Sequence, residues 1–145
     1  MKKIICAIIA AAAILLTVLA QGCGKDENAP AKGGEYDVDL TTLSSTMVYS
    51  EVYNMMTAPD DYMGKKVRMK GSFAVYEGEE KNYYACLISD ATACCSQGIE
   101  FVLDGDHSYP DDYPELGTDI TVVGIFDKYY EDDVLYCQLI HAEIV

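Results

Sequence analysis

The sequence has few of the residues on which most enzyme chemistry depends. Among its 145 residues there is no tryptophan, and the only histidines are His107 and His141. No Gly-x-Ser-x-Gly, His-Glu-x-x-His, phosphate-cradling loop or dinucleotide fingerprint occurs. Carboxylate pairs are too common in so acidic a chain to indicate a glycosidase. The sequence therefore predicts a protein that is not an enzyme and needs no cofactor.

Basic residues are also scarce. The chain has 10 lysines and arginines against 24 acidic residues, which gives a formal net charge of −14 at pH 7. Nucleic-acid-binding proteins displace counterions with basic surface, and anionic lipids attract basic segments. The charge therefore argues against DNA, RNA or an electrostatic attachment to a membrane. The negative charge has two possible roles. One is to keep the domain soluble, and the other is to form a weak site for divalent cations or for a basic partner.

The one long apolar run lies at the start of the sequence. Met1-Lys2-Lys3 is basic, residues 4–20 carry no charge, and the run breaks just before Cys23. A charged start, an apolar stretch and small residues at its end are typical of a secretion signal. Removing residues 1–22 takes away two lysines and no acidic residue, so 24 acids would face 8 bases. The processed chain would carry a net charge of −16.

The end of this run predicts a lipid anchor. Leu-Ala-Gln-Gly-Cys at residues 19–23 resembles a lipobox, which implies a signal peptide over residues 1–22 and a lipid on Cys23. Cleavage after Ala20 is the alternative and would leave Cys23 as an unpaired thiol on a soluble protein. Residues 24–34 have no large apolar side chain, so residues 23–35 are expected to be the lipidated cysteine and a flexible tether. We expect an extracytoplasmic protein attached to the cell membrane by its lipid alone.

Residues 36–145 predict one mainly β domain with a helix in front. Apolar residues recur at three- and four-residue spacing from Leu43, where Ser44 or Ser45 can cap a helix that ends before Pro59. After it, five segments have the pattern of strands: residues 67–75, 83–90, 99–103, 120–126 and 134–144. Three strands, a long connection with one helical turn and two more strands is the order of an OB-fold, a five-stranded Greek-key barrel. A β-sandwich or a half-barrel is the alternative.

Two segments of this domain resemble a known family. Asp-Tyr-Met-Gly-Lys-Lys-Val-Arg-Met-Lys-Gly at residues 61–71 resembles the Tyr-x-Gly-Lys-x-Val-x-x-x-Gly motif that begins the first strand of small bacterial OB-like domains. Residues 90–101 are similar to a segment of uncharacterised, mostly Gram-positive lipoproteins with such a domain. The resemblance covers roughly residues 37–145 and implies an OB-like barrel.

Tyrosines are the candidate ligand-binding residues of this domain. The chain has 12 of them, and Tyr76, Tyr83, Tyr84 and Tyr136 fall in or near predicted strands. OB-folds bind single-stranded nucleic acid or sugars on the face of their second and third strands, where aromatic rings stack on the ligand. Because the basic groove for nucleic acid is missing, these tyrosines indicate a sugar or peptide ligand. The alternative is that they are amphipathic rim residues of a small core.

Four cysteines would remain in the domain: Cys86, Cys94, Cys95 and Cys137. An even number outside the cytoplasm favours disulfides, and we expect Cys86 to bond to one of the adjacent pair and Cys137 to the other. A soft Zn²⁺ or Cu(I) site is the alternative, although Cys-x-x-Cys spacing is absent. A thiol redox centre is a further alternative, but Asp90 would raise the pKa of a nearby thiol.

The sequence as a whole predicts a membrane-tethered lipoprotein that acts as a non-enzymatic binding or interaction module of the cell envelope. Its ligand would be an envelope protein, a peptide or a sugar. A thiol-based zinc or copper carrier or sensor is the alternative, and an envelope thiol redox protein is a further one.

Overall fold

The computed structural model describes residues 34–90, 92 and 94–145. The predicted signal peptide, the lipidation site Cys23 and nearly all of the predicted tether lie outside the described residues. Within the described part, no helix is long and apolar enough to cross a membrane.

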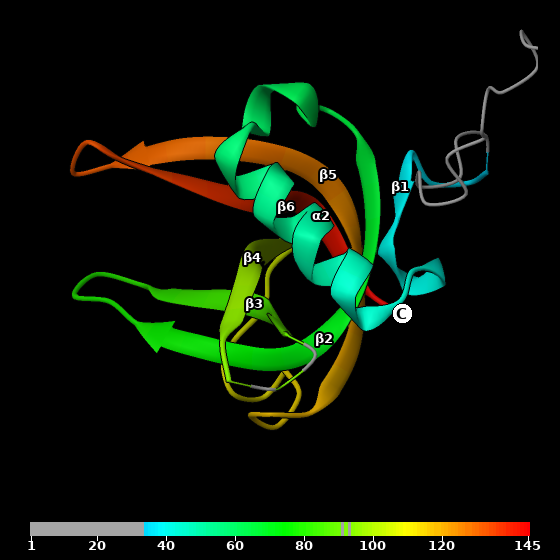
Figure 1. Ribbon diagram of the computed structural model, residues 1–145. Coiled ribbons are helices and arrows are strands. Elements are labelled where there is room, and N and C mark those ends of the chain that lie inside the picture. Colours follow the sequence, from blue (N-terminus) through cyan, green and yellow to red (C-terminus); the bar gives the residue numbers. More distant parts are fainter. Residues whose placement is uncertain (1–33, 91, 93) are drawn as a thin grey trace, which may run out of the picture.

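Strands dominate the described chain, and a single α-helix precedes most of them (Figure 1). In chain order the elements are β1 (Val38–Asp39), the 3-10 helix η1 (Leu40–Thr42), α2 (Ser45–Thr57), the 3-10 helix η2 (Pro59–Asp61), β2 (Lys66–Glu77), β3 (Asn82–Ser89), β4 (Ser96–Leu103), β5 (Asp119–Glu131) and β6 (Val134–Ile144). In the long connection between β4 and β5, the Asp112 N–H donates to the Ser108 carbonyl oxygen, which closes one turn of helical type, and a second turn follows at Pro110–Tyr113. This region overlaps the single helical turn that the sequence predicted.

Five of the strands form a closed ring of pairings. The sheet order is β1-β2-β3-β4-β6-β5, and β2 also pairs with β5. The neighbours in the ring are antiparallel except for β4 and β6, which are parallel. The mainly β class, the OB-like five-strand barrel and the preceding helix are therefore as the sequence predicted.

One long strand, β2, joins the two sides of the ring. Its residues 66–72 pair with β5, and its residues 72–77 pair with β3, so the change of partner falls at Ser72. The preceding residue, Gly71, faces the backbone of β3 closely. A Cβ at this position would lie 2.3 Å from the carbonyl oxygen of Leu87, so only glycine fits here without a shift of the strands.

The helix α2 closes the core on one side of the ring. Val52 and Met55 on its inner face are fully buried, and the helix packs against β3, β4 and β6. They join a core that includes Phe73, Phe101 and Phe126 from three different strands. Met56 also belongs to the apolar pattern of this helix, but it is 41% exposed, because adjacent residues of a helix point in different directions and Met55 takes the buried position.

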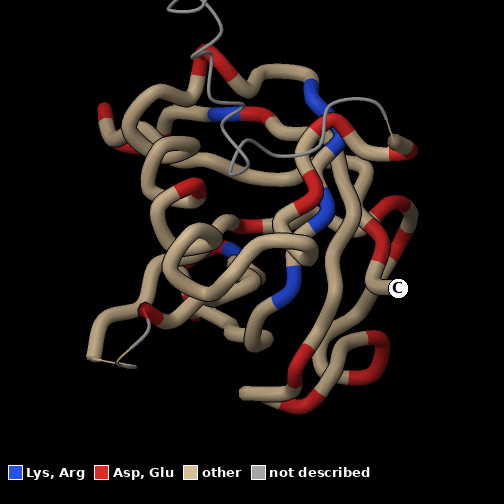
Figure 2. Tube along the Cα trace, turned by 45° about the vertical axis from the view of Figure 1, so that its right-hand side comes forward, with Lys and Arg blue, Asp and Glu red and all other residues tan. Residues whose placement is uncertain are grey.

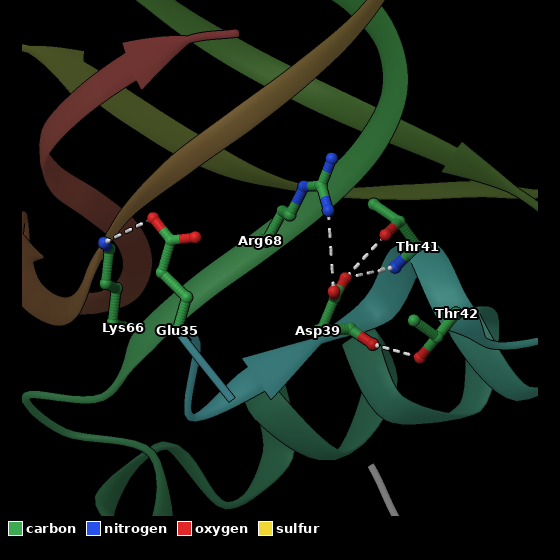
Figure 3. Close-up of polar contacts among 6 residues, drawn as sticks. All are labelled: Glu35, Asp39, Thr41, Thr42, Lys66 and Arg68. Atoms are coloured by element: carbon green, nitrogen blue, oxygen red, sulfur yellow. Dashed lines mark hydrogen bonds and ion pairs between the residues drawn. The ribbon is translucent and has the colours of Figure 1, made fainter. Parts of the chain in front are cut away.

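The first described residues are attached to the outside of β2 (Figure 3). β1 pairs in parallel with Val67 and Arg68, and the Arg68 guanidinium lies 3.7 Å from the Asp39 carboxylate. The same carboxylate accepts hydrogen bonds from the backbone N–H and the hydroxyl of Thr41, at 3.0 and 2.6 Å, which caps η1. The chain thus enters the domain on the β1 side, on the right in Figure 1.

The last hairpin is longer than the sequence predicts. β5 continues five residues beyond Phe126, and its pairing with β6 extends to Glu131 opposite Val134. The two residues of the turn, Asp132 and Asp133, have positive φ angles of 49° and 62°. That is the geometry of the tight turn whose twist matches a β-hairpin, and aspartate is among the residues that tolerate it.

Candidate ligand-binding cleft

Two hairpins project from the ring and enclose a cleft. The β2–β3 hairpin turns at residues 78–81, the β5–β6 hairpin turns at Asp132-Asp133, and both tips lie on the left in Figure 1. A cleft of about 750 Å³ opens between them, and β4 contributes one residue to its wall. Its lining consists of Tyr76, Glu77, Gly78, Glu79, Glu80, Tyr83, Glu100, Glu131, Asp132 and Tyr136.

Three of the four tyrosines predicted to form a ligand face line this one cleft. Tyr76 and Tyr83 come from the first hairpin, and Tyr136 comes from the second. The fourth, Tyr84, faces a neighbouring hollow of about 330 Å³ that shares Tyr83 and Glu100 with the cleft. The structure brings the predicted residues together, and their binding of a ligand stays a prediction.

Tyr84 differs from the other three because its ring is already packed. It stacks on Tyr113 of the β4–β5 connection at a centroid distance of 4.0 Å and lies 6.3 Å from Phe73 in the core. Burial and the neighbouring Tyr84 raise the pKa of Tyr113 to about 12. Tyr84 thus has the role of a rim residue of the core, the alternative that the sequence left open for these tyrosines.

Acidic residues form most of the polar wall of the cleft. Three come from the β2–β3 hairpin, one from β4 and two from the β5–β6 hairpin: Glu77, Glu79, Glu80, Glu100, Glu131 and Asp132. They are part of a wider excess, since acidic residues occur at many turns of the domain whereas lysine and arginine are few (Figure 2). The cleft is therefore complementary to a ligand with positive charge.

Two tyrosine hydroxyls hold two of these carboxylates in place. The Tyr83 hydroxyl donates a hydrogen bond to Oε1 of Glu131 at 2.6 Å, and the Tyr129 hydroxyl donates to Oε2 of Glu100 at 2.7 Å. The Tyr129 ring also stacks on Tyr136 at 5.3 Å. These contacts connect β3, β4, β5 and β6 and hold this wall of the cleft in place.

The same contacts shift the ionisation of the groups that make them. The hydrogen bond to Glu131 raises the pKa of Tyr83 to about 12, and burial together with the bond to Glu100 raises the pKa of Tyr129. Burial raises the pKa of Glu100, although the Tyr129 hydroxyl and the nearby Lys81 act in the opposite direction. Both tyrosines are thus neutral hydrogen-bond donors at physiological pH.

One basic side chain, Lys81, lines the neighbouring hollow together with Tyr129. The Nζ atom of Lys81 lies 4.7 Å from the centroid of the Tyr83 ring and 5.4 Å from that of Tyr129. Both distances are within the range of a cation–π interaction. Lys81 belongs to the turn of the β2–β3 hairpin and is exposed.

The four cysteines lie in three separate places and are all free thiols in the structure. Cys86 is fully buried in β3, where burial raises the pKa of its thiol to about 12. Cys137 is half-buried in β6, with its Sγ 3.8 Å from the carbonyl oxygen of Met55. Cys94 and Cys95 are exposed between β3 and β4. Partial burial also raises the pKa of the Cys137 thiol. Raised pKa values disfavour the thiolate, so Cys86 and Cys137 are poor nucleophiles.

The strand register separates Cys86 from the adjacent cysteine pair. Cys86 lies opposite Ile99, which is four residues beyond Cys95. Four residues of strand span about 13 Å, whereas a disulfide needs Cα atoms within about 7 Å. The expected disulfide between Cys86 and the adjacent pair is therefore out of reach in the structure. β4 begins at Ser96, so Cys94 and Cys95 lie in the turn that precedes it and not beside Cys86.

The metal alternative receives no support from the placement of these residues. His141, which strand alternation puts on the same face as Cys137, has a φ of 49° at an irregularity opposite Gly124. Its ring is exposed and lies 3.3 Å from the carboxylate of Asp104. Among residues 34–90, 92 and 94–145, no three His, Cys, Asp or Glu side chains are grouped so as to hold a metal ion.

Sequence reasoning missed the residues that complete the cleft. Glu100 and Glu131 are two of 24 acidic residues, and nothing in their local sequence distinguishes them. Glu131 ends a stretch, Asp-Lys-Tyr-Tyr-Glu, whose polarity hides the continuation of β5. The one usable signal was the pair of tyrosines beside an acidic turn.

The chain was compared with known proteins. No family model matches it. No curated protein matches it either.

Proposed function

We propose that this protein is a non-enzymatic binding module of the cell envelope, held outside the cytoplasm by a lipid on Cys23. Its ligand occupies the cleft between the two hairpins. The lipobox-like segment at residues 19–23 supports the location. The observation that supports the binding function most strongly is the cleft itself, where three predicted tyrosines meet six carboxylates.

The cleft suits a ligand with both flat apolar surface and polar groups. Its volume of about 750 Å³ lies within the range of small-molecule sites in proteins. Tyr76 and Tyr136 are 55% and 37% exposed, so their rings are available for contact. Tyrosine provides such contact area at little cost in conformational entropy, which is why it is common in binding surfaces. A short peptide or a sugar of the envelope fits this description.

The position of the cleft agrees with a tethered receptor. The described chain begins beside β1, on the right in Figure 1, whereas both hairpin tips lie on the left. With the anchor before β1 and a flexible tether between them, the domain is free to turn the cleft away from the membrane. The ligand would then come from the surroundings of the cell and not from the lipid surface.

Nuclear magnetic resonance titration of the processed protein, purified from bacterial cells, tests this function. The probes are a neutral chitin trisaccharide, an uncharged tripeptide and a lysine-containing pentapeptide. We expect at least one probe to shift the amide signals of Tyr76, Tyr83 and Tyr136. Tyr136→Ala should weaken its binding about tenfold. Tyr53→Ala removes a tyrosine that is 57% exposed on α2 and should leave binding unchanged. Shifts confined to other surfaces, or equal effects of the two variants, would refute the proposal.

A further inference from the structure

We infer that the ligand of this cleft carries an alkylammonium group, which binds where the cleft meets the neighbouring hollow, and that Lys81, which lines this hollow, is a tethered competitor for that place. The inference rests on the proposed function and names the chemistry of its ligand. Lys81 already shows that an ammonium can be accommodated there.

The first step is the environment of the Lys81 ammonium. It lies above the rings of Tyr83 and Tyr129, at 4.7 and 5.4 Å from their centroids. The hydroxyl of each ring donates a hydrogen bond to a carboxylate, Glu131 and Glu100 respectively. Aromatic faces next to fixed negative charge are what proteins use to recognise ammonium ligands. Tyr83 and Glu100 line both the cleft and the neighbouring hollow, so the two tyrosine–glutamate pairs form a site for a cation of this type where the two meet.

The second step is the negative charge of the cleft, which Lys81 does not neutralise by ion pairs. Six carboxylates line the cleft, and none of them belongs to an ion pair in the part of the chain that the structure describes. Lys81 likewise has no carboxylate within ion-pair distance among these residues, and its attraction to Glu100 acts over a longer distance. An incoming cation would therefore gain attraction from cleft carboxylates that have no ion-pair partner.

The third step is the ease of exchange. Lys81 is exposed at a hairpin turn, and exposed side chains change rotamer within nanoseconds. An external ammonium could therefore replace it over the rings without movement of the ring of strands. The geometry favours an ammonium over calcium, because calcium needs six to eight oxygen ligands, whereas Tyr83 and Tyr129 present ring faces and already occupy one oxygen each of Glu131 and Glu100.

Calorimetric titration at physiological salt tests the inference on the processed protein purified from bacterial cells. The probe is acetyl-Gly-Lys-Gly-Lys-Gly-amide, and its matched control is the same peptide with both lysines acetylated. We expect the acetylated peptide to bind at least about tenfold more weakly, because it has lost its ammonium groups. Equal binding of the two peptides would overturn the inference.

Substitution of the lysine tests the competition directly. Lys81→Met keeps much of the side-chain length, removes the ammonium, and should raise the affinity for the lysine peptide about three- to tenfold. Lys70→Met makes the same change in net charge six residues before Tyr76 on β2, about 20 Å away along the strand. At that distance salt screens the charge of Lys70, so Lys70→Met should change the affinity for the lysine peptide by less than about twofold. If Lys81→Met weakened binding, or acted no more strongly than Lys70→Met, the lysine would not be a competitor.

Three further probes separate the remaining possibilities. Cadaverine that binds like the peptide would identify the ammonium alone as sufficient, and cadaverine that binds weakly would show that peptide groups also contribute. Either result supports an ammonium site. Calcium that displaces the lysine peptide stoichiometrically would overturn it in favour of a metal. A trisaccharide that shifts the cleft signals while both amines fail would refute the ammonium ligand and leave the proposed function standing.

Discussion

At the scale of single residues, two tyrosine–glutamate pairs fix two carboxylates of the cleft wall. A tyrosine hydroxyl that donates to a carboxylate fixes the carboxylate and keeps the phenol neutral. Tyr83 and Glu131 come from strands that are not neighbours in the ring, so their hydrogen bond of 2.6 Å bridges the two hairpins. The pair therefore both shapes the wall and holds the hairpins at a fixed separation.

The pH dependence of this pair can be measured. The hydrogen bond raises the pKa of Tyr83 to about 12 from an ordinary value of 10.0, so the folded protein favours the neutral phenol. Its contribution to stability is complete below pH 10 and is lost as the pH rises toward 12. We expect Glu131→Gln to move the titration of Tyr83 toward lower pH, as followed by the carbon resonances of the tyrosine ring. Glu143→Gln, on the far part of β6, should not, and equal shifts in both variants would contradict the assignment.

At the scale of secondary-structure elements, β2 has the most constrained path. It changes partner from β5 to β3 at Ser72, and the preceding glycine lets the two strands approach. Gly71 also faces the Sγ atom of Cys86, which would lie 2.9 Å from an added Cβ. The bend of β2 thus depends on a residue that has no side chain.

Gly71→Ala should therefore lower the free energy of unfolding by about 1–3 kcal/mol. The added methyl group would meet a backbone oxygen of β3, which cannot move aside as a flexible side chain can. Urea unfolding followed by circular dichroism measures the change. Gly34→Ala is the matched control, because a Cβ there has no atom within 4 Å, and it should change stability by less than about 0.5 kcal/mol. A variant at Gly71 as stable as the control would show that β2 has room to shift.

The elements also show how far sequence reasoning reaches. Alternation of apolar residues was enough to predict β2 and β3, since each has one face in the core. The same pattern predicted that β5 ends at Phe126. The next five residues bury neither face fully and are held mainly by pairing with β6. That pairing is not visible in local periodicity. Prediction of the cleft is limited in the same way. Its tyrosines could be predicted from the sequence, whereas Glu100 and Glu131 line the cleft only because the ring brings distant strands together.

At the scale of the whole molecule, the proposed function depends on attachment to the membrane. If Cys23 carries a lipid, Cys23→Ser should abolish processing at that residue and release the protein from, or misplace it within, the membrane fraction. Fractionation of cells and medium, with mass spectrometry of the amino-terminal peptide, measures the outcome. Cys94→Ser is the control, because it removes an exposed cysteine of the folded domain and should leave localisation unchanged. A wild-type protein that is found unlipidated in the medium would contradict the anchor and favour cleavage after Ala20.

The closed ring also has a consequence for how this protein folds. The pairing of Lys66 with Ile125 joins residues far apart in the chain, and such long-range contacts make folding slow and cooperative. The cleft takes its walls from β2, β3, β4, β5 and β6, so no fragment or half-folded chain contains a complete binding site. Ligand binding would therefore be linked to global folding, and a saturating ligand should raise the unfolding midpoint of the entire domain in a single transition. A ligand that binds this cleft would then stabilise only the completely folded domain.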